Sequence, residues 1–65
     1  MNYPEPRIER LHAVILRTGL SRSSIYALIA KGKFVRPVKL STRAIGFISA
    51  EVDAWIASRV QSRPE

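Results

Sequence analysis

One stretch decides the fold of this 65-residue chain: Thr18-Gly19-Leu20-Ser21-Arg22-Ser23-Ser24-Ile25-Tyr26. An apolar segment, residues 11–16, precedes it. Gly19 tolerates the left-handed backbone that commonly ends a helix, and the Ser21 hydroxyl suits the N-cap of the next one, where it accepts a backbone N–H. Helix, short turn and helix in this order predict a helix-turn-helix.

Apolar residues recur at helical spacing on both sides of this turn. The first helix is predicted over residues 8–17 and the second over residues 22–31, with Gly32 ending it. The positions expected to face the core are Leu11, Val14, Ile15, Ile25, Leu28 and Ile29. Leu16 lies off this stripe; we expect partial burial at the domain edge, and a subunit contact is the alternative.

After residue 33 the spacing of the apolar residues changes from the helical period to every second residue. Val38 and Leu40 flank Lys39, and Ile45 and Phe47 flank Gly46, which predicts two half-buried strands. Pro37 suits the start of the first strand, where its missing N–H costs little. Residues 41–44 are then the loop of a hairpin, which forms a short wing.

A third helix is predicted over residues 50–61, with Ser49 as its N-cap. Glu51 and Asp53 lie near the positive end of its dipole. Apolar positions at helical spacing are expected to face the core: Val52, Trp55, Ile56 and Val60. Because Trp55 and Phe47 fall on apolar stripes, we expect core burial for both; base stacking on single strands is the alternative.

These elements define a mainly α fold with a small β-hairpin, a winged helix-turn-helix in the order helix, helix, hairpin wing, helix. Residues 1–7, which contain two prolines, are expected to form a flexible arm. Residues 8–61 form the domain and residues 62–65 a polar tail. A chain of this size has room for one small core of modest stability.

The composition is strongly basic. Eleven Lys and Arg against five Asp and Glu give a net charge of +6 and a pI near 10.9. All five acids lie near the two ends, and residues 11–50 contain none, which predicts one strongly positive face suited to duplex DNA. The chain has no cysteine, no apolar run long enough for a membrane span and no export signal, so we expect a cytoplasmic protein without membrane contact.

The residues expected to contact DNA lie in the second helix, its flanks and the wing. Arg22 in the first helical turn suits guanine or a phosphate, and Ser23 and Ser24 suit phosphates or base edges, with capping as their alternative role. Tyr26 either packs under the wing with its hydroxyl toward a phosphate or only packs in the core. The full set is Ser21, Arg22, Ser23, Ser24, Tyr26, Lys31, Lys33, Arg36, Lys39, Thr42 and Arg43.

Catalysis is not expected. His12 is the only histidine, and Glu51 and Asp53, two positions apart on a helix, diverge around its surface. The sequence contains no phosphate-binding glycine loop and no metal-ligand spacing, so no cofactor and no metal are predicted.

With these residues placed, the chain resembles the AlpA family of prophage regulators, which are related to phage excisionases and have a winged-helix fold. The resemblance covers residues 10–59. Its strongest motifs are Arg17-Thr18-Gly19-Leu20-Ser21-Arg22-Ser23-Ser24-Ile25-Tyr26, Phe34, Pro37-Val38-Lys39-Leu40, Arg43-Ala44-Ile45-Gly46-Phe47 and Glu51-Val52-Asp53-Ala54-Trp55-Ile56.

The resemblance implies that the second helix enters the major groove and that the wing touches the backbone or the minor groove. It assigns Arg22, Ser23, Ser24 and Tyr26 to the recognition helix, and Lys39 and Arg43 to the wing. The chain departs from the family at two positions. Ala27 replaces a frequent basic residue, and Phe47 stands where tryptophan is usual.

The sequence therefore predicts a double-stranded DNA-binding transcriptional regulator of a prophage or mobile element. Copies of so small a domain are expected to bind side by side on repeated sites. An excisionase-like factor that bends attachment-site DNA and recruits an integrase needs the same surface and remains an alternative. A basic module that binds an acidic protein is a second one.

Overall fold

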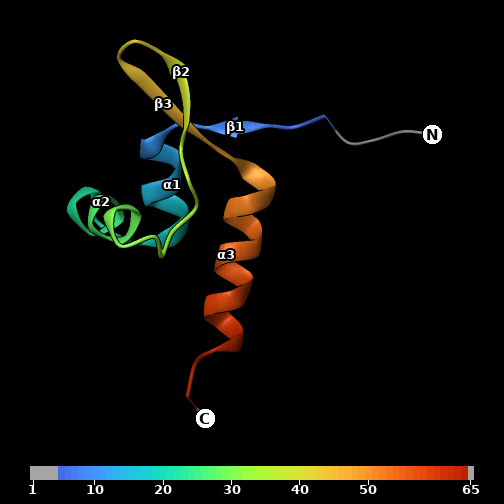
Figure 1. Cartoon of the computed structure of the whole chain (residues 1–65). Coiled ribbons are helices and arrows are strands. Elements are labelled where there is room, and N and C mark those ends of the chain that lie inside the picture. The colour runs from blue at the N-terminus through green and yellow to red at the C-terminus, as the bar shows by residue number, and fades with distance from the viewer. Residues whose placement is uncertain (1–4, 65) are drawn as a thin grey trace.

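The computed structural model describes residues 5–64 and contains three helices and a three-stranded antiparallel sheet (Figure 1). The helices are α1 (Leu11–Thr18), α2 (Arg22–Ala30) and α3 (Ser49–Gln61). The strands are β1 (Ile8–Glu9), β2 (Val38–Ser41) and β3 (Ala44–Ile48), with β3 in the centre. The predicted order of helix, helix, hairpin and helix is confirmed, and β1 is an addition to it.

The turn between α1 and α2 forms as the sequence predicts. Gly19 has φ 74°, and its N–H donates to the carbonyl of Ile15 over 2.9 Å, closing α1. Ser21 caps α2, its hydroxyl accepting the N–H of Ser24 over 3.1 Å. Gly32, with φ 70°, follows the end of α2. The left-handed backbone at both glycines disfavours any residue with a Cβ.

The N-terminal end of the domain differs from the prediction. Residues 8 and 9 do not begin the first helix but form β1, in which Ile8 pairs with Ile48 and Glu9 with Phe47. Ser49 is not an N-cap either, because Ile48 occupies that position without a side-chain hydrogen bond. The Ser49 hydroxyl instead donates to Glu9 over 2.6 Å, and its N–H donates to the Arg7 carbonyl. Of the predicted arm, residues 1–4 lie outside the described residues.

The wing is the β2–β3 hairpin, which projects beyond the helices in Figure 1. Its turn is shorter than predicted, because Ser41 pairs with Ala44 and only Thr42 and Arg43 remain unpaired. The register shifts between Lys39 and Ser41, so that β2 contains a bulge at Leu40. The bulge leaves the Leu40 side chain 41% exposed, more than the predicted alternation implies.

The core lies between the helices and β3. Its buried side chains are Leu11, Val14, Ile25, Phe34, Val35, Phe47 and Val52. Phe34 contacts the ring of Phe47 edge to face at 5.8 Å and that of Trp55 at 4.7 Å between centroids. Trp55 is half-buried against this cluster, and the prediction that Phe47 and Trp55 pack in the core is confirmed.

Two further apolar side chains, besides Leu40, are more exposed than predicted. Leu16 is 72% exposed on α1, so its expected partial burial is wrong. Val60 is 53% exposed, although it continues the helical stripe of Val52 and Ile56. The reason is visible in Figure 1, where the C-terminal half of α3 extends past α1 and α2. Periodicity predicts which face an apolar residue takes, but not where the neighbouring elements end.

Candidate nucleic-acid interface

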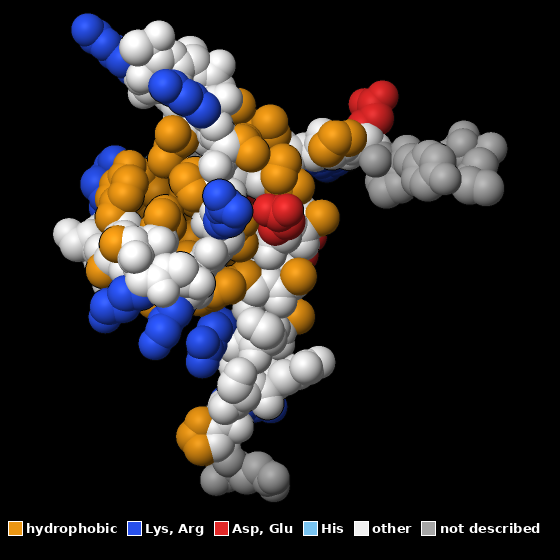
Figure 2. Space-filling model, viewed as in Figure 1, with side chains coloured by type: hydrophobic (Ala, Val, Ile, Leu, Met, Phe, Trp, Pro, Cys, Tyr) orange, Lys and Arg blue, Asp and Glu red, His pale blue; other side chains and the backbone are white. Residues whose placement is uncertain are grey.

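All eleven residues predicted to contact DNA are exposed. In Figure 2, Lys and Arg side chains lie over the β2–β3 hairpin and along the α2 side of the molecule. In the same view, the acidic side chains lie over the N-terminal segment and the start of α3. The charge segregation in the sequence is thus partly retained in space on this face, although one basic side chain lies directly beside the acidic one at the start of α3.

Arg17 binds two of the acidic side chains away from the predicted DNA contacts. Its guanidinium donates to the carboxylates of Glu9 and Asp53, joining β1, α1 and α3. The hydrogen bond to Asp53, followed by that to Glu9, raises the pKa of Arg17, although partial desolvation opposes them. Two of the five acids are therefore paired with a cation that is outside the predicted interface.

The outward side of α2 carries small residues. Because Ile25, Leu28 and Ile29 point inward, Ser23, Ala27 and Ala30, at positions i, i+4 and i+7, occupy the opposite face. All three are exposed. A helix face without bulk allows its backbone to approach another surface closely.

Arg22 and Tyr26, one turn apart, form the edge of this face that adjoins the wing. Together with Arg43 they line one hollow of 280 Å³ between α2 and the hairpin. The remaining residues around this hollow are Arg10, Leu11, His12 and Ile45. Tyr26 is 45% exposed and lines this hollow together with the wing residue Ile45, so the alternative of core packing alone is wrong. Contact of its hydroxyl with a phosphate stays a prediction.

Arg10 and His12 line this hollow and were missed by sequence reasoning. Arg10 is the N-cap residue of α1, its side chain makes no capping hydrogen bond, and His12 is exposed in the first turn. The predicted helix start at residue 8 placed both side chains inside a helix, with no reason to face the wing. The true start of α1 depends on where β1 ends, so no local signal in the sequence marks either residue.

The other predicted contacts do not share this hollow. Ser21 and Ser24 bond to each other at the start of α2, with 3.0 Å between their hydroxyl oxygens. Lys39 and Thr42 lie on the hairpin, and Arg36 precedes it. Lys31 and Lys33 lie at the opposite end of α2 from Arg22. Contact of these residues with DNA stays a prediction.

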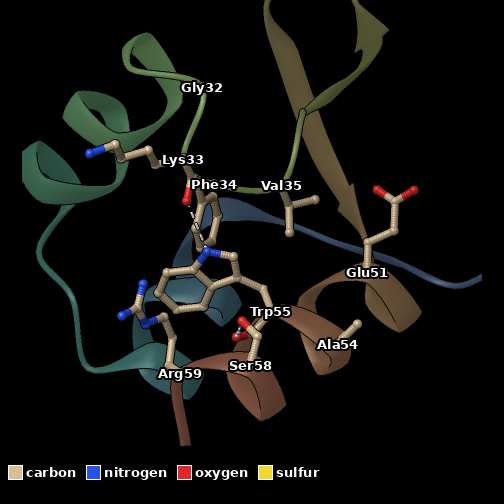
Figure 3. A pocket seen from close by; sticks show the side chains of 9 residues that line it. All are labelled: Gly32, Lys33, Phe34, Val35, Glu51, Ala54, Trp55, Ser58 and Arg59. Atoms are coloured by element: carbon tan, nitrogen blue, oxygen red, sulfur yellow. Dashed lines mark hydrogen bonds between the residues drawn. The ribbon is translucent and has the colours of Figure 1, made fainter. Parts of the chain in front are cut away.

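Lys33 lines a second hollow, of 710 Å³, beneath the end of α2 (Figure 3). There the indole N–H of Trp55 donates to the Lys33 carbonyl over 3.0 Å, and Arg59 lies over the Trp55 ring at 5.9 Å. These contacts join α3 to the segment after α2. They fix the C-terminal end of α2 relative to α3.

Comparison with known proteins identifies the family. The chain matches the family described as Prophage CP4-57 regulatory protein (AlpA) over residues 7–60. It is 41% identical over 59 residues to the uncharacterized protein ORF88 of Enterobacteria phage P4, covering 91% of this chain and 67% of that protein. It is 36% identical over 59 residues to the DNA-binding transcriptional activator AlpA of Escherichia coli K12, covering 82% of this chain and 84% of that protein.

No solved structure matches the chain closely enough to be informative. Within residues 5–64, none of the helices combines the length and the apolar character that crossing a membrane requires. The family match extends from the residue before β1 to the last turn of α3 and so covers all the elements described above. The chain belongs to the AlpA family of prophage regulatory proteins.

Proposed function

We propose that this protein is a double-stranded DNA-binding transcriptional regulator of prophage origin. The proposal rests on one observation. Arg22 and Tyr26 of α2 line the same hollow as Arg43 of the wing. Helix and wing thereby form a continuous basic surface, as a winged helix needs in order to contact a groove and its flanking backbone together. The name of the E. coli relative supports the same function.

In this proposal α2 lies in the major groove. Arg22 donates two of its guanidinium N–H groups to guanine O6 and N7, and Ser23 binds a base edge or a phosphate. The methyl groups of Ala27 and Ala30 face the groove floor, where alanine contacts the methyl group of thymine. Relatives often carry a basic residue at position 27, which can hydrogen-bond to a base. In this chain Ala27 makes a close apolar contact there instead.

The wing and the lysines supply the part of the affinity that does not depend on sequence. Lys39, Thr42 and Arg43 lie on the hairpin and bind the backbone beside the site read by α2. Each neutralised phosphate releases counterions, so affinity falls as salt rises. A net charge of +6 on 65 residues favours such binding.

Selection of bound duplexes from a random-sequence library at about physiological salt tests the proposal. We expect one enriched motif, and we expect an Arg22→Ala protein to lose enrichment at one or two of its positions. Retention without enrichment would contradict specific reading and favour the excisionase-like, architectural alternative. Absence of retention would contradict DNA binding and favour a protein partner.

We also propose that copies bind side by side on repeated sites. One module of this kind buries roughly 600–1,000 Å² of protein surface on DNA, which limits the number of base pairs it reads. Adjacent repeats multiply that specificity. Footprinting across a protein titration is expected to show protection spreading over regularly spaced repeats, and a single protected site at all concentrations would contradict this proposal.

A further inference from the structure

The hollow beside the wing combines an apolar base with a cationic rim. Leu11 is buried and Ile45 half-buried, whereas Arg10, Arg22 and Arg43 are exposed. The three guanidinium groups come from three separate parts of the chain: the residue before α1, the first turn of α2 and the hairpin turn. Such a surface suits a ligand with one apolar side and one anionic side.

We propose that this hollow binds a single sugar–phosphate unit of the DNA backbone. The deoxyribose lies against Leu11 and Ile45. The phosphate oxygens accept hydrogen bonds from the guanidinium groups of Arg10 and Arg43, and Arg22, on the α2 side of the hollow, remains available for the adjoining guanine. This inference rests on the proposed function and extends its surface from α2 and the wing to the start of α1. Arginine suits the role because its planar fork of donors matches the phosphate oxygens.

The three arginines have no counter-charge among residues 5–64. Among residues 5–64, no carboxylate lines the hollow, and the ion pairs of the domain are both made by Arg17. Like charges at one site repel one another, and a bound phosphate relieves that repulsion. By contrast, Arg17, which joins three elements of the fold, is paired with the carboxylates of Glu9 and Asp53. Arg10, Arg22 and Arg43 have no such partner among the described residues.

The test measures the affinity of the full chain for a mixed-sequence duplex of about two helical turns, roughly 21 bp, across a salt titration. Arg10→Ala is expected to weaken binding roughly tenfold at low salt and to reduce the salt slope by about 0.9, the value of one phosphate contact. Arg63→Ala, which removes the same charge from the segment after α3, is the matched control and is expected to leave the slope unchanged. Arg10→Ala should fold normally, because the side chain makes no capping bond.

Equal salt slopes for Arg10→Ala and Arg63→Ala would overturn the phosphate site while leaving the proposed function in place. A wild-type chain that fails to bind the duplex would overturn both the site and the proposed function.

Discussion

The indole N–H of Trp55 donates a hydrogen bond to the carbonyl oxygen of Lys33 over 3.0 Å. It joins α3 to the segment that leaves α2, next to the edge-to-face contact between Trp55 and Phe34. The two interactions hold the C-terminal end of α2 in place. The orientation of α2 thus depends on a residue of α3 that is not itself a proposed DNA contact.

Trp55→Phe is therefore expected to destabilise the domain without removing a DNA contact. The variant leaves the Lys33 carbonyl without its donor and shrinks the ring against Phe34, at a cost of about 1–3 kcal/mol in the free energy of unfolding. Urea unfolding followed by circular dichroism measures it. Arg59→Met, which keeps the indole and its hydrogen bond, serves as the control and should lose clearly less. Equal losses in both variants would contradict the importance of the hydrogen bond.

Replacing Ser21 is expected to affect the stability of the domain, whereas replacing Ser23 is expected to affect DNA binding. Ser21→Ala removes the cap of α2 and should cost about 1 kcal/mol of stability. Ser23→Ala removes a hydroxyl that makes no hydrogen bond with residues 5–64, so it should leave stability unchanged and weaken DNA binding. Thermal unfolding and DNA titration of both variants check the pair. Unchanged stability in Ser21→Ala would contradict the assigned cap.

Gly46 allows β1 to lie against the wing. A Cβ at this position would come within 2.4 Å of the Ile8 γ-methyl group and 3.3 Å of the Glu9 carbonyl. Gly46→Ala is expected to destabilise the domain by about 1–3 kcal/mol through overpacking. Adding Ile8→Ala, which removes the nearest group, should restore part of that loss. Chemical unfolding of the four proteins measures the coupling, and strictly additive effects would contradict the contact.

Much of the fold follows from local chemistry that the sequence displays directly. Gly19 and Ser21 define the turn because their backbone and hydrogen-bonding preferences act within a few residues. The alternation around Lys39 and Gly46 predicts the hairpin for the same reason. These features need no knowledge of distant contacts, and the structure confirms them.

The features that the sequence did not predict depend on long-range contacts. A strand of two residues, Ile8–Glu9, has no periodicity of its own and exists because β3 offers it a partner. Ser49 is recruited by Glu9, forty positions earlier, and so does not cap α3. In the candidate site, the same applies to Arg10. Its place in the hollow depends on where β1 ends, so only Arg22, Tyr26 and Arg43 of that group were foreseeable from the motif.

Arg17 is expected to stabilise the domain independently of pH near neutrality. Because its folded-state pKa is raised above the ordinary value, its contribution is complete below that value and is lost only as the pH rises through the raised one, in strongly alkaline solution. Arg17→Met should therefore lower the unfolding midpoint by a constant amount between about pH 6 and pH 9, where carboxylates are ionised. A difference that disappears within this range would contradict the pairing with Glu9 and Asp53.

Arg22 is the residue on which specific recognition is expected to depend most. It is exposed in the first turn of α2, lines the hollow beside the wing and has no acidic partner among residues 5–64. Arg22→Ala should cost about 1–3 kcal/mol in binding to the selected site and relax the sequence preference at one position. Arg22→Lys keeps the charge but loses the bidentate fork, so it should retain non-specific affinity while losing most of the discrimination. If Arg22→Lys discriminates as well as the wild type, Arg22 binds a phosphate and the bases are read by Ser23, Ala27 and Ala30.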